Sequence, residues 1–168
     1  MEKDSYRTTE KYVLFQESFL SNWYPCKITY KEYEFSSSEQ LYMYFKAQYF
    51  EDIKMMGEII NCESPKAAKE FGKMIKNFND EEWMLVCDEY MYLAVKNKFK
   101  QNPELKNLLI DLGNSKNFVE GSLYDDTWGV GLDWESIEIE NSNNWRGQNA
   151  FGKVLDRVRL DLIEKDLF

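Results

Sequence analysis

The spacing of apolar residues changes near residue 36, and this change constrains the fold more than any other feature of the chain. Through the first 35 residues apolar and polar side chains alternate, as in residues 27–35 (KITYKEYEF), and this is the period of a β-strand. We therefore expect short strands there, with a hairpin turn at Lys31-Glu32. Helical spacing dominates the rest of the chain. The pattern predicts an α+β fold that is mainly α, with a small antiparallel β element.

Capping signals predict where the helices begin. Ser36 and Glu39 fit the pattern S-x-x-E, so Ser36 is expected to cap a helix that runs to about residue 50. Ser64 followed by Pro65 predicts a second helix start. The expected helices cover residues 36–50, 53–60, 65–75, 80–99, 103–113 and 148–165. Within the loop-rich stretch 114–144, one more strand is expected at residues 136–140.

A chain of 168 residues has the usual size of one hydrophobic core, so a single domain over residues 1–168 is expected, with its core at about residues 12–165. No run of about 18 apolar residues occurs, and the start MEKDSYRTTEK is polar. We therefore expect a cytoplasmic protein with no membrane partner. The three scattered cysteines, Cys26, Cys62 and Cys87, contain no CxxC pair and do not suggest a disulfide framework.

The chain contains no histidine, and this excludes several kinds of active site. Ser-His and Cys-His nucleophiles are impossible, as are zinc sites of the HExxH or Cys2His2 type. In an enzyme of this composition, proton transfer depends on carboxylates, tyrosines, lysines or a bound ion. We expect neither a metal nor another cofactor.

The net charge of −9 argues against a broad surface for duplex nucleic acid. A small phosphorylated ligand is compatible with local groups of basic residues, although such residues also suit solvated helix faces. These groups comprise Lys96, Lys98, Lys100 and Lys106, and Arg146, Lys153, Arg157 and Arg159.

Four short segments concentrate carboxylates, tryptophan, asparagine and glycine. They are residues 19–25 (FLSNWYP), 37–46 (SSEQLYMYFK), 125–132 (DDTWGVGL) and 144–152 (NWRGQNAFG). In order and spacing they resemble the NADAR family, also called YbiA-like proteins, over about residues 15–163. The resemblance implies a YbiA-like single domain that hydrolyses the C1′–N bond of a ribosyl group. The substrates described for the family are ribosylamino-pyrimidine phosphates of riboflavin synthesis and ADP-ribosylated guanine in DNA.

Glu39 has two interpretations. Local sequence makes it a member of a capping box, whereas the resemblance makes it a catalytic carboxylate. Lys46 matches a lysine of the same family motif and, seven residues on, lies on the same helix face as Glu39. Gln40 and Met43 replace residues usual in the family, so we expect its substrate contacts to differ.

Trp83 and Asp125 have the same ambiguity. Trp83 suits a buried core, but the resemblance places it in the active site, where an indole can stack on the leaving group. Lys98 follows it in a family pattern. Asp125 begins D-x-x-W-G-x-G, which is either a tight turn or the family's second acidic segment, with Asp126 as the alternative if the register differs by one.

The remaining candidates lie in loops. Trp128 and Gly129 accompany Asp125, whereas Arg146 and Asn149 lie where a turn enters a helix. That turn either satisfies its own backbone groups or binds a phosphate or ribose oxygen. Two residues of the first segment, Asn22 and Trp23, are the last candidates. Asn22 suits binding of a ligand amide, although rigid packing of this loop on the core accounts equally well for both residues.

Together these features predict an N-glycosidase with a carboxylate pair and a small phosphorylated ribosyl substrate. Glu39 is expected to activate water, and Asp125 to orient the sugar or stabilise its cation. Lys46, Lys98 and Arg146 are candidate phosphate contacts. The alternatives are an ADP-ribosyl glycohydrolase acting on ADP-ribosylated nucleic acid, and a nucleotide-binding sensor without turnover. The sequence does not indicate an oligomeric state.

Overall fold

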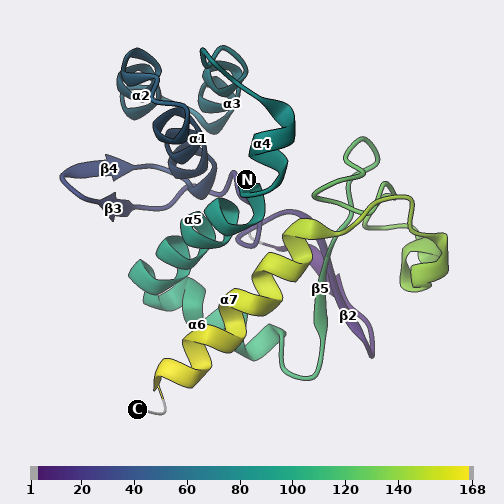
Figure 1. Cartoon of the computed structure of the whole chain (residues 1–168). Coiled ribbons are helices and arrows are strands. Elements are labelled where there is room, and N and C mark those ends of the chain that lie inside the picture. The colour runs from purple at the N-terminus through teal and green to yellow at the C-terminus, as the bar shows by residue number, and fades with distance from the viewer. Residues whose placement is uncertain (1–3, 167–168) are drawn as a thin grey trace. The chain divides into compact units, whose positions relative to one another are not determined.

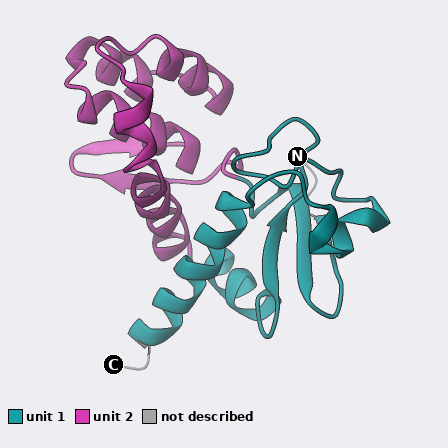
Figure 2. Ribbon diagram, turned by 45° about the vertical axis from the view of Figure 1, so that its right-hand side comes forward, with its two compact units in different colours: residues 1–21, 103–168 teal, residues 22–102 magenta. Residues whose placement is uncertain are grey.

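The structure, a computed structural model, describes residues 4–166, so the first three residues of the polar start and the last two of the chain lie outside the described residues. The chain forms two compact units (Figure 2). Unit 1 comprises residues 1–21 and 103–168, and unit 2 comprises residues 22–102. The expectation of a single domain over residues 1–168 stays a prediction.

Unit 1 is built on a three-stranded sheet with the order β1-β2-β5 (Figure 1). Its strands are β1 (Asp4–Thr8), β2 (Tyr12–Ser18) and β5 (Asn117–Glu120). β1 pairs antiparallel with β2, and β5 pairs parallel with β2, with Val13 opposite Phe118. β5 is absent from the predicted strands. Its two central residues, Phe118 and Val119, are fully buried and join the apolar residues of β2 in the core.

Two helices complete the core of unit 1, α6 (Pro103–Leu112) and α7 (Ala150–Asp166). α7 packs on β5 and on α6, and Gly113 follows the end of α6 as predicted. Two short 3-10 helices follow β5, η1 (Ile137–Glu140) and η2 (Ser142–Asn144).

The predicted strand at residues 136–140 is wrong, because these residues form η1. The Ser136 hydroxyl accepts a hydrogen bond from the Glu138 N–H at 3.2 Å and starts this helix. Ile139 is fully buried, whereas Ile137 is 79% exposed. The apolar alternation therefore does not mark a strand face.

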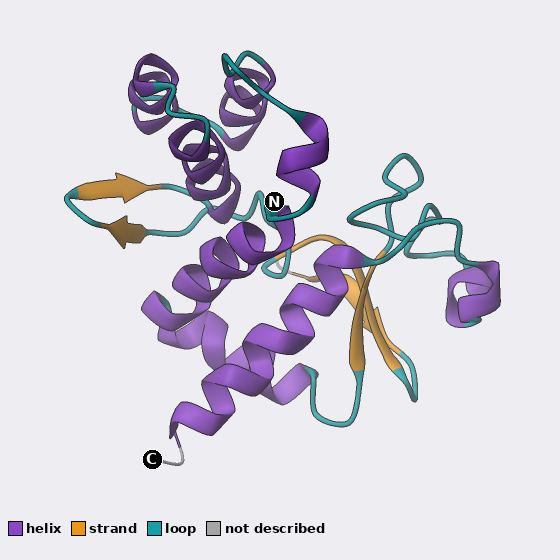
Figure 3. Cartoon of the chain, in the orientation of Figure 1, coloured by secondary structure: helices purple, strands orange, loops and turns teal. Residues whose placement is uncertain are grey.

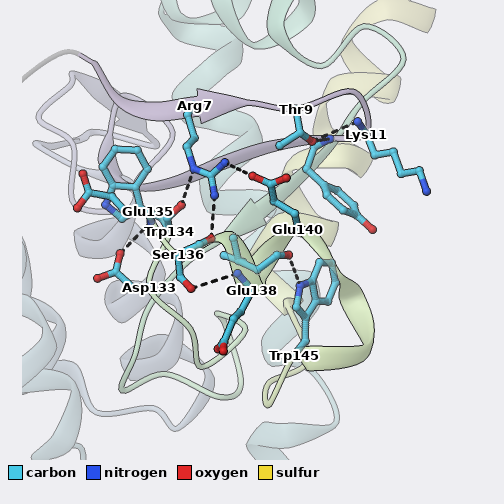
Figure 4. Close-up of polar contacts among 12 residues, drawn as sticks. Arg7, Thr9, Lys11, Asp133, Trp134, Glu135, Ser136, Glu138, Glu140 and Trp145 are labelled. Atoms are coloured by element: carbon cyan, nitrogen blue, oxygen red, sulfur yellow. Dashed lines mark hydrogen bonds and ion pairs between the residues drawn. The ribbon is translucent and has the colours of Figure 1, made fainter.

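Arg7 on β1 holds the segment around η1 against the sheet (Figure 4). Its guanidinium donates to the carbonyls of Trp134 at 3.0 Å and Ser136 at 2.8 Å, and it forms an ion pair with Glu140. These bonds join residues more than 120 positions apart in the sequence. A single side chain thus fixes the loop that precedes η1.

Unit 2 contains a β-hairpin and five helices. The hairpin strands are β3 (Ile28–Tyr30) and β4 (Tyr33–Phe35), and the predicted turn at Lys31-Glu32 is confirmed. Lys31 has φ +53°, the left-handed conformation typical of two-residue hairpin turns. The helices are α1 (Ser38–Tyr49), α2 (Ile53–Ile60), α3 (Pro65–Lys73), α4 (Asp80–Met84) and α5 (Cys87–Gln101).

The single helix predicted over residues 80–99 is wrong, because the chain breaks between α4 and α5. Val86 has φ −126° and ψ −13°, outside the helical range, and no side chain caps the helix it precedes. Trp83 and Lys98 therefore lie on different helices. The predicted fold class is nonetheless confirmed, since helices predominate over two small sheets (Figure 3). In the described chain no helix has the length and apolar character to cross a bilayer.

Candidate active site

Ser37, not Ser36, caps α1, and this corrects the predicted capping box. The Ser37 hydroxyl accepts a hydrogen bond from the Gln40 N–H at 3.1 Å, so Gln40 occupies the third helical position. Gln40 Oε1 in turn accepts a bond from the Ser36 N–H at 2.7 Å. Its Nε2 donates to the Ile59 carbonyl at 2.8 Å. Gln40 thus has the structural role that the sequence assigns to Glu39, and the Glu39 carboxylate is not used for capping.

The Glu39 carboxylate is instead held by Asn22, which precedes the hairpin. Asn22 Nδ2 donates to Glu39 Oε2 at 2.5 Å, and both residues are buried, with 7% and 6% of their surfaces exposed. The backbone is tied at the same place, since the Asn22 carbonyl accepts from the Glu39 N–H at 3.0 Å. The acidic side chain also lies in the first turn of α1, where the helix dipole favours negative charge.

Lys46 lies two turns further along α1 and is already engaged by the protein. Its Nζ donates to the Gly72 carbonyl at 3.1 Å and lies 4.2 Å from the centre of the Phe78 ring. Burial lowers the pKa of Lys46, and the charges of Asp80 and Glu39 oppose this effect. Glu39 and Lys46 thus interact electrostatically on one helix, as their spacing predicts.

Gly72 allows α3 to approach α1 closely enough for this contact. A β-carbon at position 72 would overlap the sulfur of Met43, one turn from Lys46 on α1. Any larger residue would require the flexible Met43 side chain to move. The close approach accounts for the Lys46 bond to a backbone carbonyl.

Trp83 lies in a cluster of aromatic side chains from α1, α4 and α5. It stacks on Tyr90, with ring centres 5.5 Å apart and planes 16° apart. The Tyr42 ring lies 5.6 Å away and the Tyr49 ring 5.8 Å away. One face of the indole is therefore covered by Tyr90, so a stacked leaving group would need the other face or the edge.

Tyr42 connects Trp83 with Glu39. Burial raises the pKa of Tyr42 well above its usual value, with further raising by the charges of Cys87 and Glu39 and an opposing hydrogen bond from Trp83. Its phenol therefore stays protonated across the physiological range and acts only as a neutral hydrogen-bonding group. Tyr42 is not among the site residues predicted from the sequence. Its position three residues after Glu39 was the available signal.

Lys98 is completely buried in α5. Its Nζ lies 5.0 Å from the centre of the Phe99 ring and 5.5 Å from that of Tyr24. Burial lowers the pKa of Lys98 to about 7, and the charge of Cys26 opposes this shift. The amine thus contacts Tyr24, in the loop that follows Asn22. Its role as a phosphate contact stays a prediction.

In unit 1, Asp125 organises its own loop. Its Oδ1 accepts hydrogen bonds from the N–H groups of Thr127 at 3.1 Å, Trp128 at 2.8 Å and Gly129 at 3.4 Å. No hydrogen bond from the described residues engages its Oδ2. Asp125 is partly exposed and Asp126 is exposed. One oxygen of Asp125 therefore holds the turn, and the other is available for a ligand.

The segments 125–132 and 144–152 lie side by side, joined by backbone hydrogen bonds. The N–H groups of Gln148, Asn149 and Phe151 donate to the carbonyls of Asp126, Gly129 and Trp128, at 2.9, 3.0 and 3.0 Å. Gly147 is required at this junction, because a β-carbon there would overlap the Gly129 carbonyl. The two segments resembling the family motifs thus form one structure.

The side-chain amide of Asn149 forms hydrogen bonds within the protein, whereas the Arg146 side chain is exposed. Asn149 has φ +53°; its Oδ1 accepts from the Glu120 N–H at 3.0 Å, and its Nδ2 donates to the Phe118 carbonyl at 2.9 Å. This residue joins the start of α7 to β5. Arg146 is exposed and forms no ion pair with any residue in the described part of the chain.

Two of the predicted substrate contacts, Trp23 and Trp128, are tryptophans. Trp23 follows Asn22 and is 36% exposed, with Lys69 Nζ 5.9 Å from its ring centre. Trp128 is partly buried in the Asp125 loop. The predicted residues are thus divided between the two units. Unit 2 contains Asn22, Trp23, Glu39, Lys46, Trp83 and Lys98, and unit 1 contains Asp125, Trp128, Gly129, Arg146 and Asn149.

The donor chemistry of these residues suits proton transfer and anion binding. Across residues 4–166, no three acidic, cysteine or histidine side chains are grouped as ligands for a metal ion. The buried carboxylate of Glu39 can take up and release a proton. Arg146 offers an exposed cation for a phosphate.

Comparison with known proteins matches residues 5–163 to the NADAR domain family model. The chain is 34% identical over 166 residues to "N-glycosidase R617" of Acanthamoeba polyphaga mimivirus, covering 90% of this chain and 96% of that protein. It is 30% identical over 146 residues to "Riboflavin biosynthesis protein VVA0006" of Vibrio vulnificus, covering 87% of this chain and 36% of that protein. The NMR structure of the Escherichia coli protein YbiA has the same fold, with a TM-score of 0.77 and 24% identity over 98% of this chain and 92% of that chain.

Proposed function

This chain belongs to the NADAR domain family, and we propose that it hydrolyses the C1′–N bond of a phosphorylated ribosylamino-pyrimidine by means of Glu39 and Asp125. The enzyme class, an N-glycosyl hydrolase, follows from relatives named N-glycosidases. The pyrimidine substrate is supported by the relative named for riboflavin biosynthesis, of which this chain matches about one third.

The observation that carries the proposal is the state of Glu39. Ser37 and Gln40 cap the helix, in place of Ser36 and Glu39. The buried Glu39 carboxylate is held instead by the Asn22 amide at 2.5 Å. Keeping a carboxylate away from water costs free energy, so a buried carboxylate calls for an explanation. A fixed carboxylate of this kind is suited to general acid–base catalysis.

In the proposed reaction, Glu39 takes a proton from water as the water oxygen bonds to C1′ of the ribose. The C1′–N bond breaks and its electron pair passes to the nitrogen, which takes up one proton, from solvent or from Glu39, as the base departs. Positive charge develops on the sugar during this step, and the second carboxylate, Asp125, stabilises it. The proton held by Glu39 then returns to solvent or to the departing base.

The remaining side chains serve binding in this proposal. Arg146 contacts the 5′-phosphate, since it is exposed and forms no ion pair within the described residues. Lys46 contributes positive potential from its position on α1, two turns from Glu39. Trp83 borders the base with the part of its indole that Tyr90 does not cover. Lys98 and Asn149, which are both buried, stay further candidates for binding the substrate.

One experiment tests the substrate. The protein is incubated separately with a ribosylaminopyrimidine phosphate and with an oligonucleotide carrying ADP-ribosylated guanine, and released base or ADP-ribose is detected by mass spectrometry. The proposal expects release from the first substrate. Release from the second alone would identify the ADP-ribosyl glycohydrolase activity, and binding without any product would identify a nucleotide sensor.

A further inference from the structure

The Asn22 side chain has an unsatisfied atom beside the proposed catalytic carboxylate. Its Nδ2 donates to Glu39 Oε2 at 2.5 Å, whereas its Oδ1 is buried and has no hydrogen-bond partner in the described part of the chain. Buried polar atoms without partners are rare in folded proteins, and each calls for an explanation. The explanation here lies in the chemistry of the partner, Glu39.

The Asn22 backbone is anchored beside Glu39, and burial restricts the movement of its side chain. The Asn22 carbonyl accepts from the Glu39 N–H at 3.0 Å and from the Ser38 hydroxyl at 3.2 Å. Only 7% of the residue is exposed. The amide group can therefore rotate about its own Cβ–Cγ bond, but the side chain stays against Glu39.

The two edges of an amide match the two protonation states of a carboxyl group. An ionised carboxylate only accepts hydrogen bonds, so it must face the N–H edge of Asn22, as observed. A protonated carboxyl group carries an O–H donor, which matches the oxygen edge. A half-turn of the amide exchanges these edges with little change in shape. The unpaired Oδ1 can then accept a hydrogen bond from the O–H of protonated Glu39.

We infer that Asn22 is a positioning residue that keeps a hydrogen bond to Glu39 both before and after Glu39 takes up a proton. The inference rests on the proposed function, in which Glu39 receives a proton from water and later releases it. In the first state Asn22 Nδ2–H donates to Oε2, and in the second the Glu39 O–H donates to Asn22 Oδ1. Because the carboxyl group keeps a partner throughout, it holds its orientation toward the water.

Other charged groups near Glu39 influence the same equilibrium. The positive charge of Lys46 on α1 favours the ionised form of Glu39, whereas Tyr42 stays neutral. Asp80 on α4 and Cys87 at the start of α5 act on Lys46 and Tyr42 respectively. None of these groups offers both a donor and an acceptor in the way that the Asn22 amide does.

An NMR titration tests the inference without relying on turnover. Protein labelled with carbon-13 at glutamate carboxyls and nitrogen-15 at asparagine amides is titrated with acid, and the Glu39 signal is assigned by its loss in Glu39→Gln. We expect the Asn22 amide signals to change with the same midpoint as the Glu39 carboxyl. In Asn22→Ala the Glu39 midpoint should rise by about one pH unit, because the ionised form loses its donor.

A second variant keeps the test decisive if Asn22→Ala does not fold. Asn22→Asp has nearly the same shape, offers an acceptor but no donor, and adds a like charge. The two carboxyl groups should then titrate as a coupled pair, with one midpoint raised further than in Asn22→Ala. Asn61→Ala is the matched control, since Asn61 is exposed and its amide donates to the Gly57 carbonyl in α2 and not to Glu39.

Unchanged Asn22 amide signals through the Glu39 titration, or an unmoved Glu39 midpoint in both variants, would overturn the inference. Kinetics add a second readout on the ribosylaminopyrimidine phosphate, with kcat about tenfold lower in Asn22→Ala and KM nearly unchanged. If the wild-type protein releases no base while the titration behaves as described, the proposed function fails and the pairing of Asn22 with Glu39 stands.

Discussion

The indole of Trp83 is stacked on the phenol ring of Tyr90, with 5.5 Å between their centres and 16° between their planes. The two residues lie on different helices, α4 and α5, which are separated by the break at Val86. Their stacking therefore holds α4 in place after the backbone leaves the helical path. Trp83 is thus important to the fold whether or not its edge contacts a substrate.

Trp83→Ala should lower the free energy of unfolding by about 3–5 kcal/mol, the usual cost of removing a large buried aromatic side chain. Urea denaturation measures this loss. Trp23→Ala is the matched control, because Trp23 is 36% exposed and should cost much less. A similar small effect of both substitutions would mean that the aromatic cluster does not hold α4.

The buried Lys98 predicts an unusual dependence of stability on pH. Since burial lowers its pKa from 10.5 to about 7, the unfolded chain binds more protons than the folded one between these values. The contribution of Lys98 to the free energy of unfolding is therefore least favourable below pH 7. It becomes more favourable as the pH rises from about 7 toward 10. Lys98→Met should be more stable than wild type at pH 6, with the difference narrowing toward pH 10. Denaturation curves at both pH values decide this, and a constant difference would contradict it.

Local sequence predicted the parts of the fold whose signals are local. Ser64 accepts a hydrogen bond from the Ala67 N–H at 3.1 Å and starts α3 as predicted. The hairpin turn at Lys31-Glu32 is also where the alternation placed it. By contrast, no side chain caps the helix that begins after Val86, so no capping residue in the sequence indicates the break. The four residues of β5 are too few to show a period, and their partner strand lies about 100 positions away.

In the candidate site, too, local sequence predicted some features, whereas others depend on tertiary contacts. Glu39 and Lys46 follow from helical spacing, and their electrostatic interaction is present. The shift of the cap from Ser36 to Ser37 depends on Gln40 reaching the carbonyls that end α2, a tertiary contact that local sequence does not encode. The junction between the Asp125 loop and the start of α7 consists of backbone groups, and no side-chain pattern records it.

Arg146→Met should raise KM for a 5′-phosphorylated ribosyl substrate by about tenfold and leave KM for the dephosphorylated form nearly unchanged, because a charge-assisted bond to phosphate is lost. Lys46→Met should give a smaller effect, since Lys46 is also bound to the Gly72 carbonyl. Steady-state kinetics with both substrates measure the effects. Equal losses on both forms would show that these residues shape the site and do not bind the phosphate.

Excess chelator should leave the rate unchanged. The expectation rests on the sequence, which has no histidine and no closely spaced cysteines, and on a mechanism in which carboxylates move the protons. The rate is measured before and after dialysis against EDTA. Loss of activity that a divalent cation restores would instead make Glu39 and Asp125 oxygen ligands of a hard metal ion.

The turnover of Glu39→Gln tests the central claim most directly. Gln keeps the shape of Glu39 and can still accept from Asn22, so the melting temperature should stay near that of wild type. Ser37→Ala is the control for capping and should lose about 1 kcal/mol of stability while the chemistry is retained. The account predicts that Glu39→Gln lowers kcat by at least ~100-fold in a folded protein. A folded Glu39→Gln enzyme with wild-type kcat would contradict it.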